Sequence, residues 1–119
     1  MKAYAGALEA VDRILNRGGD ADDVLRQVVG ALHERMETFS WVGIAFVEDE
    51  ALALGPASGE PPPQTTGVAI SYEGRRVAEL QVAAAELTAA DRAFLERVAL
   101  LISPYCLVGW DTGGEAWSP

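Results

Sequence analysis

The sequence predicts an α+β domain, with an antiparallel sheet of about four to five strands backed on one face by two N-terminal helices and one C-terminal helix. Apolar residues recur at helical spacing near both ends of the chain. Between them, two pairs of short apolar runs, each pair joined by a charged turn, are typical of β-hairpins. With 119 residues, the chain can build one core but not two. We therefore expect a single domain over residues 1–108 and a tail over 109–119.

Composition narrows the range of partners. The 18 acidic and 9 basic residues give a net charge of -9, and the arginines form no basic stripe, so neither nucleic acid nor an anionic membrane is an expected partner. Half of the residues are hydrophobic, but no run approaches the roughly 18 apolar residues that span a bilayer. A secretory signal contains a uniformly apolar stretch, whereas the N-terminal segment here is amphipathic, so no such signal is expected. A cytoplasmic location is predicted.

The first two helices are delimited by local signals. Tyr4, Leu8, Val11 and Leu15 fall on one helical face. Gly18-Gly19 should end this first helix, and Asp20 should cap a second one, with Asp22 and Asp23 in its first turn. A helix start explains these acids better than a metal loop does, and no metal site is predicted. The second helix should bury Leu25, Val28, Val29, Leu32 and Met36.

The last helix should start after Thr88, which forms a shortened capping box with Asp91. Pro104 should kink or end it near Ser103. Its buried face is expected to carry Phe94, Leu95, Val98, Leu101, Ile102 and Tyr105.

Strand alternation assigns the sheet residues to two faces. One face should be mostly bulky and covered by the helices: Val42, Ile44, Phe46, Leu52, Leu54, Val68, Ile70, Tyr72, Ala78, Leu80 and Val82. The opposite, open face should be small or polar, apart from a tryptophan: Trp41, Gly43, Ala45, Val47, Ala51, Ala53, Ala69, Ser71, Val77, Glu79 and Gln81.

The open face has two interpretations. It is either the solvated side of an antiparallel sheet, which we favour, or a shallow ligand surface. In the second case the predicted ligand-binding residues are Trp41, Ala45, Glu79, Gln81 and Trp117. Exposed tryptophans commonly become covered, so Trp41, Trp110 and Trp117 are expected to meet the tail or a second subunit.

The stretch from Trp41 to Val47, its acidic turn 48–50 and the following Leu-Ala-Leu-Gly-Pro resemble the first hairpin of a GAF domain. The likeness is greatest to the branch of free-methionine sulfoxide reductases, and it extends to residues 72–82 and to Asp91–Leu95. It implies a GAF-like (profilin-like) fold. In this family the first and last helices often pair across a dimer axis, so the resemblance also implies a homodimer through the terminal helices or the tail.

One departure from the family bears on activity. The family carries a long middle segment that roofs a ligand pocket on the open face, but here a short connection with Pro61–Pro63 replaces it. The resemblance thus implies no deep enclosed site and no bound cofactor. The reductases need nucleophilic and resolving cysteines, and Cys106 stands alone on an apolar helix. His33 is the sole histidine, so we predict no catalytic residues.

Three functions follow as hypotheses. The first is a non-catalytic module that acts by protein association in signalling or regulation, and it is the one we favour. The alternative is a small-molecule sensor that uses the open face. The third is a degenerate reductase, which requires a reactive Cys106.

Overall fold

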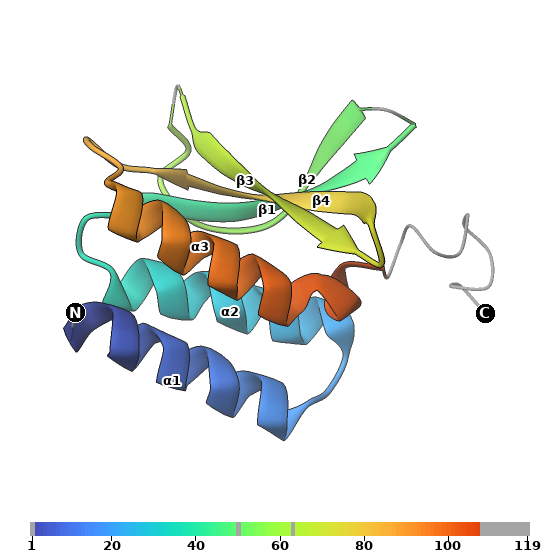
Figure 1. Cartoon of the computed structure of the whole chain (residues 1–119), viewed down its shortest axis with the longest axis horizontal. Coiled ribbons are helices and arrows are strands. Elements are labelled where there is room, and N and C mark those ends of the chain that lie inside the picture. Colours follow the sequence, from blue (N-terminus) through green and yellow to red (C-terminus); the bar gives the residue numbers. More distant parts are fainter. Residues whose placement is uncertain (1, 50, 63, 108–119) are drawn as a thin grey trace.

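The computed structural model describes residues 2–49, 51–62 and 64–107. Along the chain it contains α1 (Lys2–Arg17), α2 (Ala21–Arg35), β1 (Trp41–Glu48), β2 (Ala51–Gly59), β3 (Thr66–Tyr72), β4 (Arg75–Ala83), α3 (Ala89–Ile102) and a 3-10 turn, η1 (Ser103–Leu107). The three helices lie on one side of a four-stranded sheet, as predicted (Figure 1). Among the described helices, none is long and apolar enough to cross a membrane.

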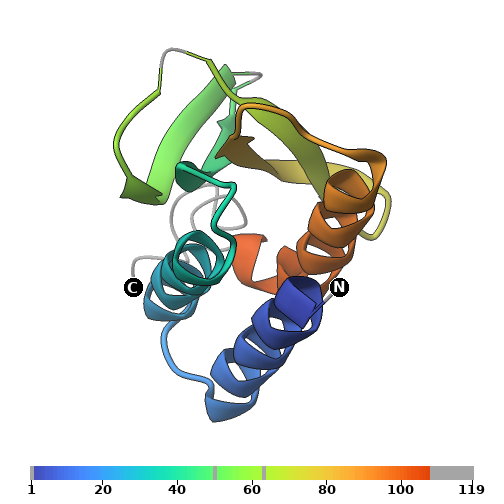
Figure 2. The same ribbon diagram turned by 90° about the vertical axis from the view of Figure 1, so that its left-hand side faces the viewer.

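The sheet has the order β2-β1-β4-β3, and all of its neighbouring strands are antiparallel. The two predicted hairpins, β1–β2 and β3–β4, are joined by pairing of β1 with β4. Since β2 and β3 occupy opposite edges, the connection between them must cross from one edge to the other. Figure 2 shows it passing over the side of the sheet that faces away from the helices.

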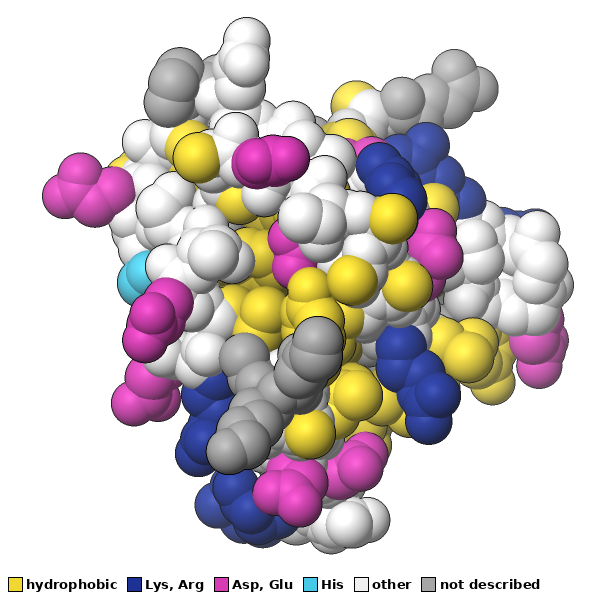
Figure 3. Space-filling view, turned by 60° about the vertical axis from the view of Figure 1, so that its left-hand side comes forward, with side chains coloured by type: hydrophobic (Ala, Val, Ile, Leu, Met, Phe, Trp, Pro, Cys, Tyr) yellow, Lys and Arg dark blue, Asp and Glu magenta, His cyan; other side chains and the backbone are white. Residues whose placement is uncertain are grey.

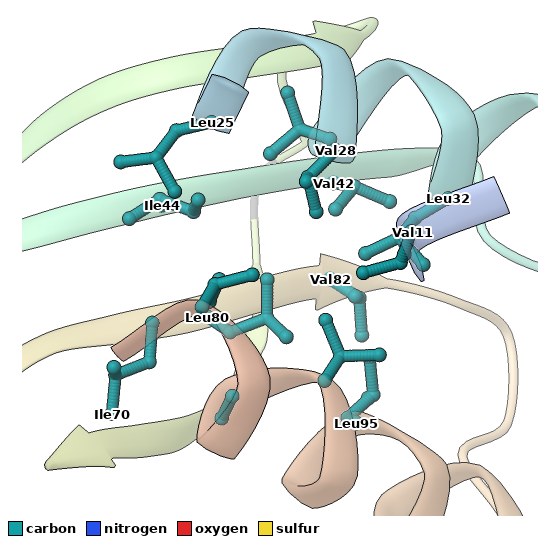
Figure 4. Packing of buried hydrophobic residues seen from close by; sticks show 14 of the residues in the cluster. Val11, Leu25, Val28, Leu32, Val42, Ile44, Ile70, Leu80, Val82 and Leu95 are labelled. Atoms are coloured by element: carbon teal, nitrogen blue, oxygen red, sulfur yellow. The ribbon is translucent and has the colours of Figure 1, made fainter. Parts of the chain in front are cut away.

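The core fills the space between the helices and the sheet. Side chains of β1 and β4 point toward those of α2 and α3, and Val11 of α1 joins them (Figure 4). Burial of each such side chain contributes about 1.5–3 kcal/mol. The residues predicted for the second helix are all buried: Leu25, Val28, Val29, Leu32 and Met36.

The predicted helix boundaries are confirmed, with one difference at a cap. Gly18 and Gly19 adopt positive φ angles of 72° and 121°, which end α1. Asp20 occupies the N-cap position of α2, but its side chain makes no capping hydrogen bond, contrary to our expectation. Asp22 instead pairs with Arg26 at 2.9 Å, one turn along the helix.

The start of α3 follows the prediction closely. Thr88 accepts a hydrogen bond from the Asp91 backbone N–H, and the Asp91 carboxylate accepts one from the Thr88 N–H. The α-helix ends at Ile102, before Pro104. Two of the predicted core residues, Leu101 and Tyr105, are only half-buried.

Two leucines lie on the opposite face from the one we predicted. Val47 pairs with Leu52, and Ala45 pairs with Leu54, so both leucines share the open face and are 44% and 61% exposed. The cause is the turn: Glu48 pairs directly with Ala51, and this register reverses the assumed alternation. Ala51 and Ala53, predicted for the open face, take the helix side instead.

Val77 was also assigned to the wrong face. Ile70 pairs with Ala78 and Ser71 with Arg76, so Val77 is an extra residue in β4. A bulge of this kind interrupts the alternation. Val77 is therefore fully buried in the core, whereas its neighbours Glu79 and Gln81 keep the predicted open side.

A hydrogen bond joins the first helix, α1, to the last, α3. Tyr4 of α1 donates its hydroxyl to the Asp91 carboxylate of α3 at 2.5 Å, and its ring lies 5.1 Å from that of Phe94. Burial opposes ionisation of Asp91, but the hydrogen bonds from Tyr4 and Thr88 outweigh it and lower its pKa. The same bond to Asp91, with partial desolvation, raises the pKa of Tyr4.

The first prediction concerns this bond. Because folding lowers the pKa of Asp91, this carboxylate stabilises the fold at pH values above 3.8, its ordinary pKa. The contribution is lost as the pH falls through the lower pKa of the folded state. Because folding raises the pKa of Tyr4, its protonated hydroxyl stabilises the fold at pH values below 10.0, its ordinary pKa. That contribution is lost as the pH rises through the higher pKa of the folded state. The variant Tyr4→Phe should therefore melt at a lower temperature than wild type between these values. The difference should shrink at both extremes.

Thermal melts from pH 2 to pH 11 would measure this. Tyr105→Phe is the matched control, because Tyr105 is half-buried and makes no hydrogen bond within the described residues. A pH-independent loss in Tyr4→Phe would contradict the prediction.

The second prediction concerns Gly59, at the end of β2. Its φ angle is 108°, and an added Cβ would lie 2.4 Å from the Ser40 carbonyl oxygen. Because both the backbone conformation and the contact exclude a side chain, Gly59→Ala should lower the free energy of unfolding by more than about 2 kcal/mol. Urea denaturation would measure this free energy.

Gly74→Ala is the control, since Gly74 has a φ of 82° but open space around it. This variant should lose only about 1 kcal/mol of the free energy of unfolding. Equal losses would refute the steric argument.

Candidate functional site

Four of the five predicted ligand-binding residues meet on the open face of the sheet. Ala45 pairs with Glu79, and the neighbouring Gly43 pairs with Gln81, while Trp41 lies two residues before Gly43 on the same strand. These four residues therefore share one face, and their role in ligand binding stays a prediction. The fifth residue, Trp117, lies outside the described residues, and so does Trp110.

Trp41 fills much of the room that small residues would otherwise leave. An added Cβ on Gly43 would lie 2.5 Å from Cη2 of Trp41, so the indole ring lies directly over this glycine. Trp41 is only 4% exposed and Ala45 only 3%. We expected the tail or a second subunit to cover Trp41; its side chain is buried, and the tail lies outside the described residues.

A chain of polar contacts also lies on the open face. Glu79 accepts hydrogen bonds from Arg76 at 3.0 Å and from Gln81 at 2.8 Å. Its side chain also lies over Gly67, where an added Cβ would be 2.5 Å from the carboxyl carbon. Gly43 and Gly67 thus each accommodate a neighbouring side chain rather than an open pocket.

Sequence reasoning missed a groove on the outer side of α1 and α2. It has a volume of about 380 Å³, and Ala10, Gly30 and Ala31 are among the residues that line it. An added Cβ on Gly30 would meet no atom within 4 Å. The sequence did carry a signal for this groove, because Gly30 lies inside a predicted helix. A glycine at such a position destabilises the helix by roughly 1 kcal/mol relative to alanine.

Charged side chains surround this groove. Arg13, Arg17 and Arg35 line it together with Glu34. None of these four makes a hydrogen bond or ion pair within the described part of the chain. On a protein of net charge -9, this is a local concentration of cations that are unpaired in the part of the chain that the structure describes.

The residues that could carry chemistry are held in structural contacts. Cys106 is fully buried, and desolvation raises its pKa to about 12. His33 contacts Ser58 across α2 and β2, with 2.9 Å between Nδ1 and Oγ. Within residues 2–49, 51–62 and 64–107, no group of three His, Cys, Asp or Glu side chains could hold a metal ion.

The sequence matches no family model and no curated protein. Solved structures do resemble it. Free methionine-R-sulfoxide reductase from Neisseria meningitidis, in complex with its substrate, is 16% identical with a TM-score of 0.74, covering 89% of this chain and 90% of its own. The GAF domain of Acinetobacter phosphoenolpyruvate-protein phosphotransferase is 14% identical with a TM-score of 0.71, covering 92% and 98%. A GAF sensor protein described as putative, from Burkholderia vietnamiensis, is 16% identical with a TM-score of 0.72, covering 87% and 88%.

These likenesses agree with the element order and the sheet described above. They unite regulatory GAF domains with sulfoxide reductases, so at this level of identity they establish architecture rather than activity. The expected resemblance is confirmed at the level of the fold: the chain is a GAF-like α+β domain, related in structure to the free-methionine sulfoxide reductases.

Proposed function

We propose that this chain is a non-catalytic GAF-like module that acts by association in signalling or regulation, and that it forms a homodimer through the outer face of α1 and α2. The observation that carries the proposal is the open space above Gly30. Among the described residues nothing requires a glycine there, since an added Cβ would meet no atom within 4 Å. A helix from a second copy packs closest where side chains are small, and Ala10 and Ala31 continue the same floor.

The charged side chains around the groove support a second copy of the chain as the partner that packs into it. In a two-fold arrangement whose axis crosses the helices at right angles, equivalent helices run in opposite directions, so the start of α2 in one copy meets the end of α2 in the other. The acidic residues Asp20 and Asp23 would then approach Arg35, and Arg17 would approach Glu34. Two chains of net charge -9 repel one another, and local pairs of this kind offset that repulsion.

The absence of catalysis is part of the proposal. A thiol catalyst must ionise to attack a sulfoxide, and the burial that raises the pKa of Cys106 to about 12 disfavours its thiolate. The His33 ring contacts Ser58, but within the described residues no ion pair with an acid orients it. These contacts are those of structural side chains.

A second candidate is a small-molecule sensor that uses the open face. The contacts of Glu79 with Arg76 and Gln81 favour it, because such a polar chain could exchange partners with a ligand. The indole of Trp41 counts against it, since it already occupies the space above Gly43. We therefore rank association first.

The third prediction tests the dimer. Wild-type protein should be a dimer at micromolar concentration, and Gly30→Gln should weaken association by at least about tenfold, because the longer side chain fills the groove floor. Glutamine is a better helix former than glycine, so the variant should not lose stability. Light scattering and sedimentation over a concentration series would measure the mass, and thermal melts would measure stability.

Ala93→Gln is the matched control, because Ala93 is exposed on α3, away from the groove. It should leave the mass unchanged. A wild-type monomer throughout the series, or a Gly30→Gln variant that dimerises as tightly as wild type, would refute the proposal.

The fourth prediction tests the absence of thiol chemistry. A disulfide reagent such as dithionitrobenzoate should modify Cys106 in urea within minutes but leave it unmodified in the native protein, because the buried side chain offers neither access nor thiolate. The native protein should also fail to reduce free methionine sulfoxide in the presence of dithiothreitol. Rapid native modification together with turnover would support the degenerate reductase instead.

A further inference from the structure

A second hollow lies at the end of the molecule where all three helices and two loops converge. Its volume is about 810 Å³, and its lining comes from the start of α1, residues 35–38 after α2, and residues 85–91 around the start of α3. Figure 3 looks onto this end and shows hydrophobic side chains at the bottom of a depression, with acidic and basic groups around it. This size is within the range of small-molecule sites.

The floor and one wall of this helix-end hollow are rigidly held. Met36 is 4% exposed, and the Tyr4 ring is backed by Phe94. On the wall, Asp91 is 6% exposed and is fixed by the Tyr4 hydroxyl and the Thr88 N–H. Held in this way, the carboxylate is a fixed negative charge beside an apolar surface.

The rim adds charges that are unpaired among residues 2–49, 51–62 and 64–107. Glu37 and Glu86 are exposed and, like Arg35, make no hydrogen bond or ion pair within the described residues. With Asp91, the lining carries three acids against Arg35, and the positive α-amino group of the chain also acts on Asp91, which leaves Glu37 and Glu86 as the uncompensated charges of the rim. An anion would meet this excess of negative charge, whereas a cation with an apolar body would satisfy both the rim and the floor.

We propose that the helix-end hollow binds a small organic amine, with its apolar body against Tyr4 and Met36 and its ammonium group toward Glu37 and Glu86. The site is distinct from the open face of the sheet. It does not depend on the proposed dimer, although Arg35 borders both surfaces.

The fifth prediction uses phenethylammonium as the probe, with 2-phenylethanol and 3-phenylpropionate as neutral and anionic controls of similar size. In nitrogen-15 NMR titrations, the amine should shift backbone amides of residues 36–38 and 85–91. It should bind at least about fivefold more tightly than the carboxylate, the order expected for one or two exposed ion pairs.

Glu37→Gln and Glu86→Gln should each weaken amine binding about two- to fivefold, and the double variant more than either. Glu96→Gln is the control, because this exposed α3 glutamate does not line the hollow. Repeating the titration with Gly30→Gln separates failure of this site from failure of the dimer. Shifts outside the hollow, equal affinity for the three probes, or unchanged affinity in the double variant would overturn the proposal.

Discussion

The close approach of Trp41 to Gly43 is the contact on which the open face of the sheet depends. Residues 41–45 of β1 are all buried, although helices cover only one side of the strand. On the other side, the six-membered ring of the Trp41 indole packs against Gly43, a residue without a side chain, and so shields this part of the strand from water. Burial of an aromatic side chain of this size is among the larger stabilising contributions that a single residue makes.

The sequence predicted the parts of the fold that depend on neighbouring residues. The capping box of Thr88, the glycine stop after α1 and the end of α3 before Pro104 are local signals, and each was found in place. The face assignments of Val42 and Ile44 also held, because alternation within one strand is a local property. They failed at Leu52, Leu54 and Val77, where a turn register or a bulge shifted the alternation.

The candidate surfaces were harder to predict, for a related reason. The cluster of Ala45, Glu79 and Gln81 could be found because strand pairing brings together residues whose faces are predictable. The burial of Trp41 could not, since it depends on the absence of a side chain at Gly43 and on a rotamer. The helix-end hollow joins residues about 90 positions apart, such as Tyr4 and Asp91, and only tertiary packing brings them together.

The crossing between β2 and β3 has a consequence for how such a domain can vary in length. Both ends of this connection are fixed by strand pairing, and the segment itself passes outside the core (Figure 2). The entropy of closing a loop grows slowly, at about 0.6 kcal/mol for each doubling of its length. A longer segment inserted between Glu60 and Thr65 would therefore leave the strand register unchanged and extend only what lies above the sheet. This connection is the natural point at which to graft a lid onto the scaffold.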